Sequence, residues 1–386
     1  MRLSQTFRNL KFIVVATAVL CRVAAADGAP ADIDATIDEA AQTLMATHAI
    51  PGLAIAITAQ GTPRFYEYGV ASTTTQQAVT RDTLFEIGSV SKTLTATLAA
   101  YAEAQGKLSL TDSPSRYLPD LAGSALDQIT LIDLATHTAG GFPLQLPDEV
   151  RDDQQLIDYF NAWQPQYPPR THRTYANPSI GLLGRVAAKS LGLPYADALQ
   201  SELLPKLQMR STFIKVPASE LPRYAQGYDK DGRPVRLNPG LLADEAYGVK
   251  TTSEDLLRLV EIQLGVREVD DAVRQAMAAT RSGYYRVGAM TQALVWEHYE
   301  YPAALDDVLT GNSSKMALES HPTTPIRPAL PPQDDVWVNK TGSTNGFGAY
   351  VAFVPAKQLG IVILANRYYP NEARVKFAYR ILGLLH

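Results

Sequence analysis

The sequence contains one Ser-x-x-Lys motif, Ser89-Val90-Ser91-Lys92, which opens a stretch rich in Ala, Leu and Thr. In a helix that starts here, Ser89 and Lys92 lie one turn apart on the same face. A serine hydroxyl is a weak nucleophile at neutral pH, so it needs a nearby amine to accept its proton, and the positive end of a helix dipole assists it. The motif predicts a nucleophilic serine. The alternative is that Ser89 only caps the helix and Lys92 is a surface lysine.

A second group of this kind is Lys340-Thr341-Gly342, which lies at the end of a predicted strand and is followed by Ser343. A lysine and a hydroxyl on a strand edge can bind a carboxylate, and small residues let a carbonyl substrate lie against the backbone. The backbone N–H groups of Ser89 and Ser343 would then form an oxyanion hole. A lone tripeptide of this type is usually a turn with an exposed lysine, but its position after Ser-x-x-Lys favours a binding role.

A Tyr-x-Asn pattern occurs three times, beginning at Tyr159, Tyr175 and Tyr369. We prefer Tyr175, because it lies in a loop just before a predicted helix, whereas Tyr159 falls on the apolar face of a helix and Tyr369 follows the last strand. Two lysines near a phenol favour its anion, so Tyr175 is a candidate general base. The alternative for this motif is that Asn177 is only the N-cap of the following helix.

These residues must be positioned by elements that the hydrophobic pattern indicates at the two ends of the chain. The predicted elements are a helix at 33–47, a hairpin of strands 53–58 and 64–68, strands 336–341, 348–354 and 360–365, and a helix at 372–385. We therefore expect an α/β (α+β) fold, in which both chain ends form one antiparallel sheet flanked by helices.

The middle of the chain has mainly helical signals. Helices are predicted at 91–105, 154–163 and 180–191, the first and last closed by Gly106 and Gly192. The proline-rich segment 305–335 is interpreted as an irregular surface excursion. The α/β part would thus comprise about 27–88 and 335–386, with a mainly helical inserted subdomain at about 89–334.

The first 26 residues have the composition of a secretory signal peptide. Basic residues precede an apolar run at 12–20, and three alanines at 24–26 form a cleavage site. The apolar run is too short to span a membrane. We expect cleavage near Asp27, a single catalytic domain at 27–386, export to the periplasm and no membrane attachment. A lipid anchor on Cys21, the only cysteine, is disfavoured by the bulky Leu20 before it.

Composition excludes several classes of function. A net charge of −4 at pH 7 gives no support for binding nucleic acid or an anionic membrane. The mature chain would lack cysteine, which excludes disulfides and a cysteine nucleophile, and the six histidines show no metal-ligand spacing. Ser89 is not in a Gly-x-Ser-x-Gly motif. We expect no cofactor, no metal and a monomer.

The three motifs, in the order Ser-Val-Ser-Lys, Tyr-Ala-Asn and Lys-Thr-Gly, resemble those of the class C serine β-lactamases. Segments 134–141, 245–250, 340–355 and 365–367 support this resemblance, which extends over the whole mature chain. It implies a serine β-lactamase-like fold and hydrolysis of the β-lactam amide bond, best in cephalosporins, with antibiotic resistance as the result. It also implies that Ser89 is acylated and that Lys92 and Tyr175 manage protons. The substrate-binding residues that it implies are Gln145, Asn177, Lys340, Thr341, Gly342, Ser343, Asn371 and Arg374.

Two positions depart from the family pattern: Asn339 stands where the family often has His, and Tyr368 where it often has Asn. Both bear on the substrate profile more than on the chemistry. Three alternatives remain open: a soluble D,D-peptidase or penicillin-binding protein, a related esterase using the same serine, and a non-catalytic protein that binds β-lactams or muropeptides. A class A β-lactamase is disfavoured, because no Glu-x-x-x-Asn loop lies between the second and third motifs.

Overall fold

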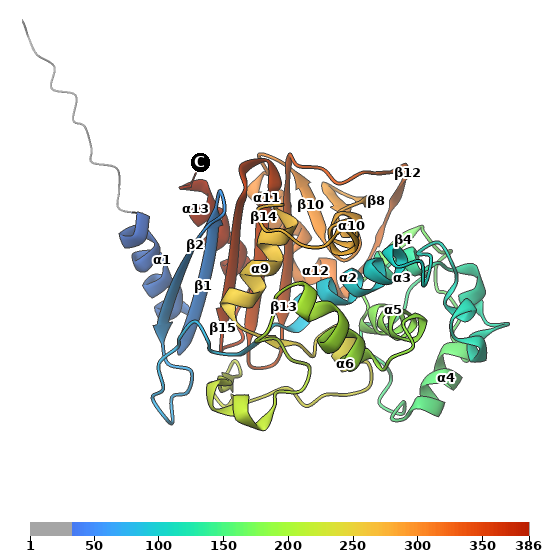
Figure 1. The fold of residues 1–386 in the computed structure, drawn as a ribbon, viewed down its shortest axis with the longest axis horizontal. Helices are drawn as coiled ribbons and strands as arrows, with labels where there is room; N and C mark the ends of the chain where they lie inside the picture. Colours follow the sequence, from blue (N-terminus) through green and yellow to red (C-terminus); the bar gives the residue numbers. More distant parts are fainter. Residues whose placement is uncertain (1–32, 386) are drawn as a thin grey trace, which may run out of the picture.

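The computed structural model describes residues 33–385, so the predicted signal peptide lies outside the described residues. These residues build an antiparallel nine-stranded sheet (Figure 1). In spatial order its strands are β12 (Thr324–Leu330), β8 (Gly283–Val287), β9 (Met290–Gln292), β10 (Glu297–Glu300), β13 (Val336–Ser343), β14 (Gly348–Val354), β15 (Leu359–Ala365), β1 (Gly52–Ala59) and β2 (Thr62–Gly69).

Helices cover both faces of this sheet. Helices α1 (Ile33–His48) and α13 (Asn371–Gly383) pack on one face, whereas α9 (Ser253–Gln263) packs on the other, against β1 and β15 (Figure 1). Alternate residues of a strand point to opposite faces, so a strand covered on both sides is apolar throughout. Strands β14 and β15 accordingly bury every residue. Of these two strands, β14 lies beside β13, whose end carries the Lys-Thr-Gly motif.

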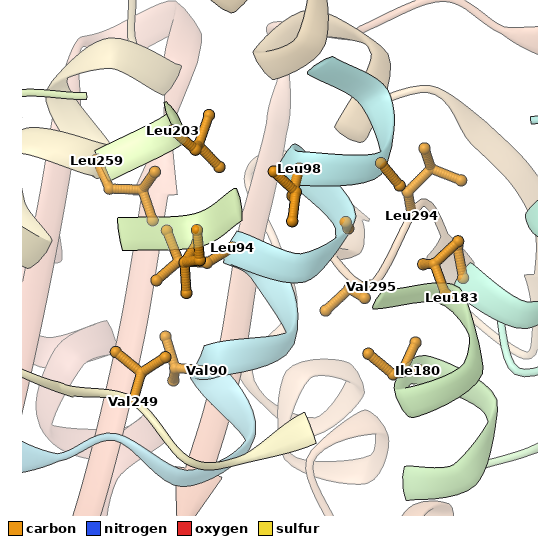
Figure 2. Close-up of a cluster of buried hydrophobic side chains, with 14 of the residues drawn as sticks. Val90, Leu94, Leu98, Ile180, Leu183, Leu203, Val249, Leu259, Leu294 and Val295 are labelled. Atoms are coloured by element: carbon orange, nitrogen blue, oxygen red, sulfur yellow. The ribbon is translucent and has the colours of Figure 1, made fainter. Parts of the chain in front are cut away.

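Helix α2 (Ser91–Ala104) is the central element of the helical part. Its residues 91–102 are all buried, and its sequence is accordingly rich in Ala and Thr, whose small side chains allow close packing on every side. Figure 2 shows Leu94 and Leu98 of α2 among side chains from α5 (Asn177–Ser190) and α9. Helix α10 (Asp271–Thr280) also packs on α2. The helix that follows Ser89 is thus held from several directions.

The remaining elements are short. The helices are α3 (Leu131–Ala135), α4 (Asp153–Ala162), α6 (Tyr195–Asp197), α7 (Leu204–Lys206), α8 (Ala243–Ala246), α11 (Leu305–Gly311) and α12 (Ser314–Leu318). Three two-stranded sheets pair β3 (Phe85–Glu86) with β7 (Lys250–Thr251), β4 (His172–Thr174) with β11 (Ser320–Pro322), and β5 (Gly227–Tyr228) with β6 (Pro234–Val235).

The structure confirms the predicted fold class and the predicted terminal elements, but it corrects the boundary of the sheet. Strands β8, β9, β10 and β12 come from 283–330, within the segment 89–334 that is predicted to be mainly helical with irregular parts. The prediction that 305–335 is irregular is wrong, because this segment contains α11, α12, β11 and β12. Prolines are tolerated in β12 because it is the edge strand of the sheet, where a missing N–H breaks no ladder.

Candidate active site

Ser89 lies in a short 3-10 turn, Gly88–Val90, that leads into α2. The side chain of Ser89 caps neither this turn nor α2, whose N-cap is Val90. The hydroxyl is instead the acceptor of a hydrogen bond from Nζ of Lys92, at 2.9 Å. The capping alternative is therefore excluded, and the expected one-turn pairing of Ser89 with Lys92 is present.

Two glycines let this turn press directly against the end of β13. A Cβ atom on Gly342 would lie 2.0 Å from the carbonyl oxygen of Ile87 and 3.0 Å from the backbone nitrogen of Ser89. A Cβ atom on Gly88, whose φ is +50°, would lie 2.4 Å from the backbone nitrogen of Ser343. Neither position has space for a side chain. The contact places the backbone of Ser343 beside that of Ser89, the two residues whose amides are predicted to form an oxyanion hole.

Lys92 is fully buried, so the surface-lysine alternative is also excluded. Its Nζ donates to Ser89 Oγ and, at 2.8 Å, to the carbonyl oxygen of Ala246 at the end of α8. Burial is the main reason that the pKa of Lys92 falls to about 8; Tyr175 opposes this shift and Lys340 adds to it. Such a lysine can hold or release a proton near neutral pH.

Tyr175 follows β4 directly, and its ring lies between two ammonium groups. Nζ of Lys92 and Nζ of Lys340 are each 5.1 Å from the ring centroid. The hydroxyl is buried and makes no well-aligned hydrogen bond within the described residues. Burial alone would raise the pKa of Tyr175, but the charges of Lys340 and Lys92 outweigh it and lower the pKa to about 8. The predicted stabilisation of the phenolate by two cations is therefore present.

A buried ion pair, which no pattern in the sequence predicts, lies next to the Tyr175 ring. The guanidinium carbon of Arg173 is 5.5 Å from the Tyr175 ring centroid. Arg173 pairs with Glu297 of β10 at 2.9 Å and donates to Gln292 of β9 at 2.6 Å. The only signal in the sequence is that Arg173 precedes Tyr175 by two residues. Its partners lie more than a hundred residues away.

Asn339, one of the two departures from the family pattern, belongs to the same buried network. Its Nδ2 donates to the carbonyl oxygen of Glu297 at 3.1 Å. Its Oδ1 accepts from Asn312 at 2.7 Å and from Tyr350 at 3.0 Å. A neutral amide thus stands next to Lys340 in β13, fixed by bonds to β10, β14 and the end of α11.

Two cavities meet at Ser89 and Tyr175. The first, which we term the Lys340 cavity, is also lined by Thr341, Gly342, Ser343, Asn371, Arg173, Glu297 and Asn312. The second, the Gln145 cavity, is also lined by Leu144, Asn177, Arg236, Leu237, Asn238, Tyr247, Ser343, Thr344 and Asn345. Apart from Lys92, which lies behind Ser89, and Arg374, every predicted site residue lines one of them. Asn177 does not cap α5, and its buried Oδ1 has no hydrogen-bond partner among residues 33–385.

Arg374 lies close to the two cavities but lines neither of them. It is fully buried behind β13, where NH1 donates to the carbonyl oxygen of Gly342 at 2.7 Å and to Ser343 Oγ at 2.9 Å. Burial lowers the pKa of Arg374. Any effect of this residue on a ligand must pass through the strand that it holds. Tyr368, the other departure from the family pattern, is 47% exposed and lines neither cavity.

A carbonyl carbon that reached Ser89 Oγ would meet a hydroxyl bonded to Lys92, in a cavity that Tyr175, Lys340 and Ser343 also line. This arrangement suits attack on an acyl group followed by hydrolysis. The fold and the site together define a serine hydrolase.

Comparison with known proteins specifies the family. The model of the family described as Beta-lactamase matches residues 37–385, and the chain belongs to this family. A β-lactamase of Lysobacter lactamgenus is 49% identical over 375 residues, which cover 97% of each chain. The crystal structure of a β-lactamase/D-alanine carboxypeptidase from Pseudomonas syringae is 54% identical, with a TM-score of 0.90 over 91% of this chain and 98% of its own. A class C β-lactamase in complex with cefoxitin is 49% identical, with a TM-score of 0.89 over 91% and 98%.

Proposed function

We propose that this protein hydrolyses the amide bond of β-lactam antibiotics through an acyl-enzyme on Ser89 and thereby confers resistance. The observation that carries the proposal is the hydrogen bond from buried Lys92 to Ser89 Oγ, with the Tyr175 phenol between Lys92 and Lys340. The names of the relatives at 49% and 54% identity support β-lactams as the substrate class.

In acylation, Ser89 Oγ loses its proton to the Lys92–Tyr175 pair and attacks the carbonyl carbon of the ring. The oxyanion accepts hydrogen bonds from the amides of Ser89 and Ser343. The C–N bond of the ring then breaks, and the nitrogen takes the proton back from the pair. Both groups have a pKa of about 8, so a proton can move between them and the substrate at little cost.

The two cavities hold different parts of the substrate. In the Lys340 cavity, Lys340 and Thr341 receive the substrate carboxylate, and Asn371 lies on the same wall. In the Gln145 cavity, Gln145 and Asn177 contact the acylamino side chain. Gly342 lets the ring approach the backbone of β13. Arg374 is a positioning residue, because it bonds to Ser343 rather than lining a cavity.

In deacylation, water attacks the Ser89 ester, and the Tyr175 phenolate takes the proton of that water. The ester bond breaks, Ser89 Oγ recovers a proton, and the opened acid leaves. A phenolate kept available by two cations supports this role. The same group distinguishes the proposal from a non-catalytic binding protein, which would need no base for deacylation.

A second candidate function is carboxypeptidase action on a peptide that ends in D-Ala-D-Ala. The observation that favours it is the double name of the Pseudomonas syringae structure, β-lactamase/D-alanine carboxypeptidase. Both reactions acylate a serine, and they differ in the leaving group and in how fast each ester is hydrolysed. We infer that β-lactam hydrolysis is the faster of the two.

We further propose that the protein prefers cephalosporins, acts as a monomer, and is exported to the periplasm after removal of residues 1–26. The composition of that segment supports export. Within residues 33–385, no helix is long and apolar enough to cross a membrane.

The test offers the purified protein a chromogenic cephalosporin, a penicillin and a D-Ala-D-Ala peptide, and follows the intact mass over time. We expect rapid turnover of the cephalosporin, slower turnover of the penicillin and little hydrolysis of the peptide. A stable adduct on Ser89 without turnover would instead identify a binding protein or a slow peptidase. Cleavage of the targeting segment is checked by N-terminal sequencing of protein recovered from the periplasm.

A further inference from the structure

Beyond Tyr175, which it shares with the Lys340 cavity, the Gln145 cavity is lined by neutral side chains and a single arginine. The polar side chains that line it are amides and hydroxyls, such as Gln145, Asn177, Asn238 and Thr344. Arg236, which follows β6, is the one arginine, lysine or carboxylate residue on this wall in the part of the chain that the structure describes. A lone cation in a neutral pocket gives the pocket a preference for negative charge in its ligand.

Contacts with its neighbours fix the guanidinium of Arg236 in place. Its central carbon lies 4.1 Å from the centroid of the Tyr224 ring. Its NH2 donates to the carbonyl oxygen of Tyr224 at 2.7 Å, and its Nε donates to that of Ala225 at 3.3 Å. Stacking and two hydrogen bonds to carbonyl groups hold the guanidinium plane while NH1 stays available to a ligand.

The Tyr224 ring, on which Arg236 stacks, is itself held in place by hydrogen bonds. The hydroxyl of Tyr224 donates to Oε1 of Glu86, which is buried. The same carboxylate accepts from the backbone of Leu237 at 2.8 Å and from Thr344 at 2.6 Å. Both of these residues line the Gln145 cavity. Glu86 therefore links Tyr224, Leu237 and Thr344 through hydrogen bonds. It is not an ion-pair partner of Arg236.

Other arginines near this hairpin have carboxylate partners. Arg233, three residues earlier, pairs with Asp229 and Asp231, and Arg223 pairs with Glu220. Arg236 forms no ion pair within residues 33–385. Its positive charge is thus available to an incoming group, and a guanidinium suits a carboxylate, which it can bind through two parallel hydrogen bonds.

We propose that Arg236 selects substrates whose acylamino side chain ends in a carboxylate. This inference rests on the proposed function, in which the Gln145 cavity holds the acylamino side chain. It names the substrate class that the cavity favours: β-lactams with an anionic side chain, such as a dicarboxylic acid joined to the ring through one of its carboxyl groups.

The test uses two cephalosporins with the same ring system, one with a glutaryl side chain and one with the terminal amide of that side chain. The readout is the ratio of kcat/KM for the acid to kcat/KM for the amide. Because the pair is solvent-exposed, we expect this ratio to be roughly two- to fivefold higher in the wild type than in Arg236→Gln. The difference should shrink in about 1 M salt, where charges are screened within a few ångströms.

Two further variants test whether the effect is specific to Arg236. Arg233→Gln removes a nearby arginine that does not line the cavity, and we expect it to leave the ratio unchanged. Arg236→Lys keeps the charge, and its ratio should stay above that of Arg236→Gln. An equal drop in Arg233→Gln, or no drop in Arg236→Gln, would overturn the assignment of Arg236 while the amide substrate is still hydrolysed. Failure of both substrates to react would contradict the proposed function instead.

Discussion

The two cavities that meet at Ser89 are built from different elements. The Lys340 cavity is walled by β10, β13, α11 and α12, and its side chains belong to a buried network through Glu297 and Asn312. The Gln145 cavity is walled mostly by loop residues, which lie between α3 and α4, after β6, after α8 and after β13, and both Gln145 and Arg236 are exposed. The residues proposed for the chemistry are thus mostly buried, whereas recognition of the variable part of a substrate is left mainly to exposed loops.

The largest effect should come from Ser89, one of the residues that line both cavities. We expect Ser89→Ala to lower kcat/KM by about 10⁴-fold or more, because no acyl-enzyme can form. The measurement is turnover of a chromogenic cephalosporin, with the intact mass checked for an adduct. Substantial remaining turnover without an adduct would show that the ring opens by direct attack of water.

Tyr175→Phe tests whether the phenol is the base. We expect a loss of about 10² to 10⁴-fold in kcat/KM. In the wild type, the phenolate fraction falls about tenfold for each pH unit below a pKa of about 8, so the rate should fall as the pH is lowered. Lys92 titrates in the same range, so this midpoint belongs to the pair.

The pH profile of Tyr175→Phe supplies the control. Interaction with Tyr175 raises the pKa of Lys92, so removing the hydroxyl should lower that pKa and move the remaining acid limb to lower pH. A variant that keeps both the rate and the profile of the wild type would show that Lys92 alone supplies the base.

The buried network under the Lys340 cavity can be broken at Arg173. Arg173→Met leaves Glu297 buried without its ion-pair partner, which should lower the free energy of unfolding by roughly 3 kcal/mol. Thermal or denaturant unfolding measures this loss. The control is Arg286→Met, whose partner Glu300 is 85% exposed, and which should cost less than about 1 kcal/mol. Similar losses in the two variants would mean that the buried ion pair contributes no more to the free energy of unfolding than the exposed one.

The smallest effect is expected on the loop side. Gln145→Ala removes an exposed amide, so we expect a change of roughly two- to tenfold in kcat/KM, mainly through KM. The change should vary between substrates with different acylamino groups and nearly vanish for one that lacks the group. A uniform loss in kcat across substrates would place Gln145 in the chemistry and would remove the distinction between the two cavities.

The sequence predicted the parts of the molecule that local patterns determine. Amphipathic periodicity located α1, helical signals closed by a glycine located α2 and α5 to within a few residues, and the apolar runs located β14 and β15. Short strands such as β9, and the proline-containing edge strand β12, carry little local signal. Their strand conformation comes from pairing with neighbours, so the sequence analysis missed them.

The same limit applies to the site. Ser89 and Lys92 lie one turn apart where the 3-10 turn leads into α2, so their spacing alone predicts their contact. Arg173 and Glu297 meet only through the tertiary fold, and no spacing rule connects residues that far apart. The reverse holds for Arg374. The resemblance implies that it lies near a ligand, but only the fold shows that it lies behind β13.

The glycine contact between the nucleophile turn and β13 also limits how the protein can adapt under antibiotic selection. A single added methyl group at Gly88 or Gly342 would collide with backbone atoms, which cannot move aside as a flexible side chain can. Mutations that broaden the range of accepted drugs are therefore expected to accumulate away from this contact. The exposed loops around Gln145 and Arg236 can vary at little cost to folding, so new resistance should arise there while the nucleophile stays fixed.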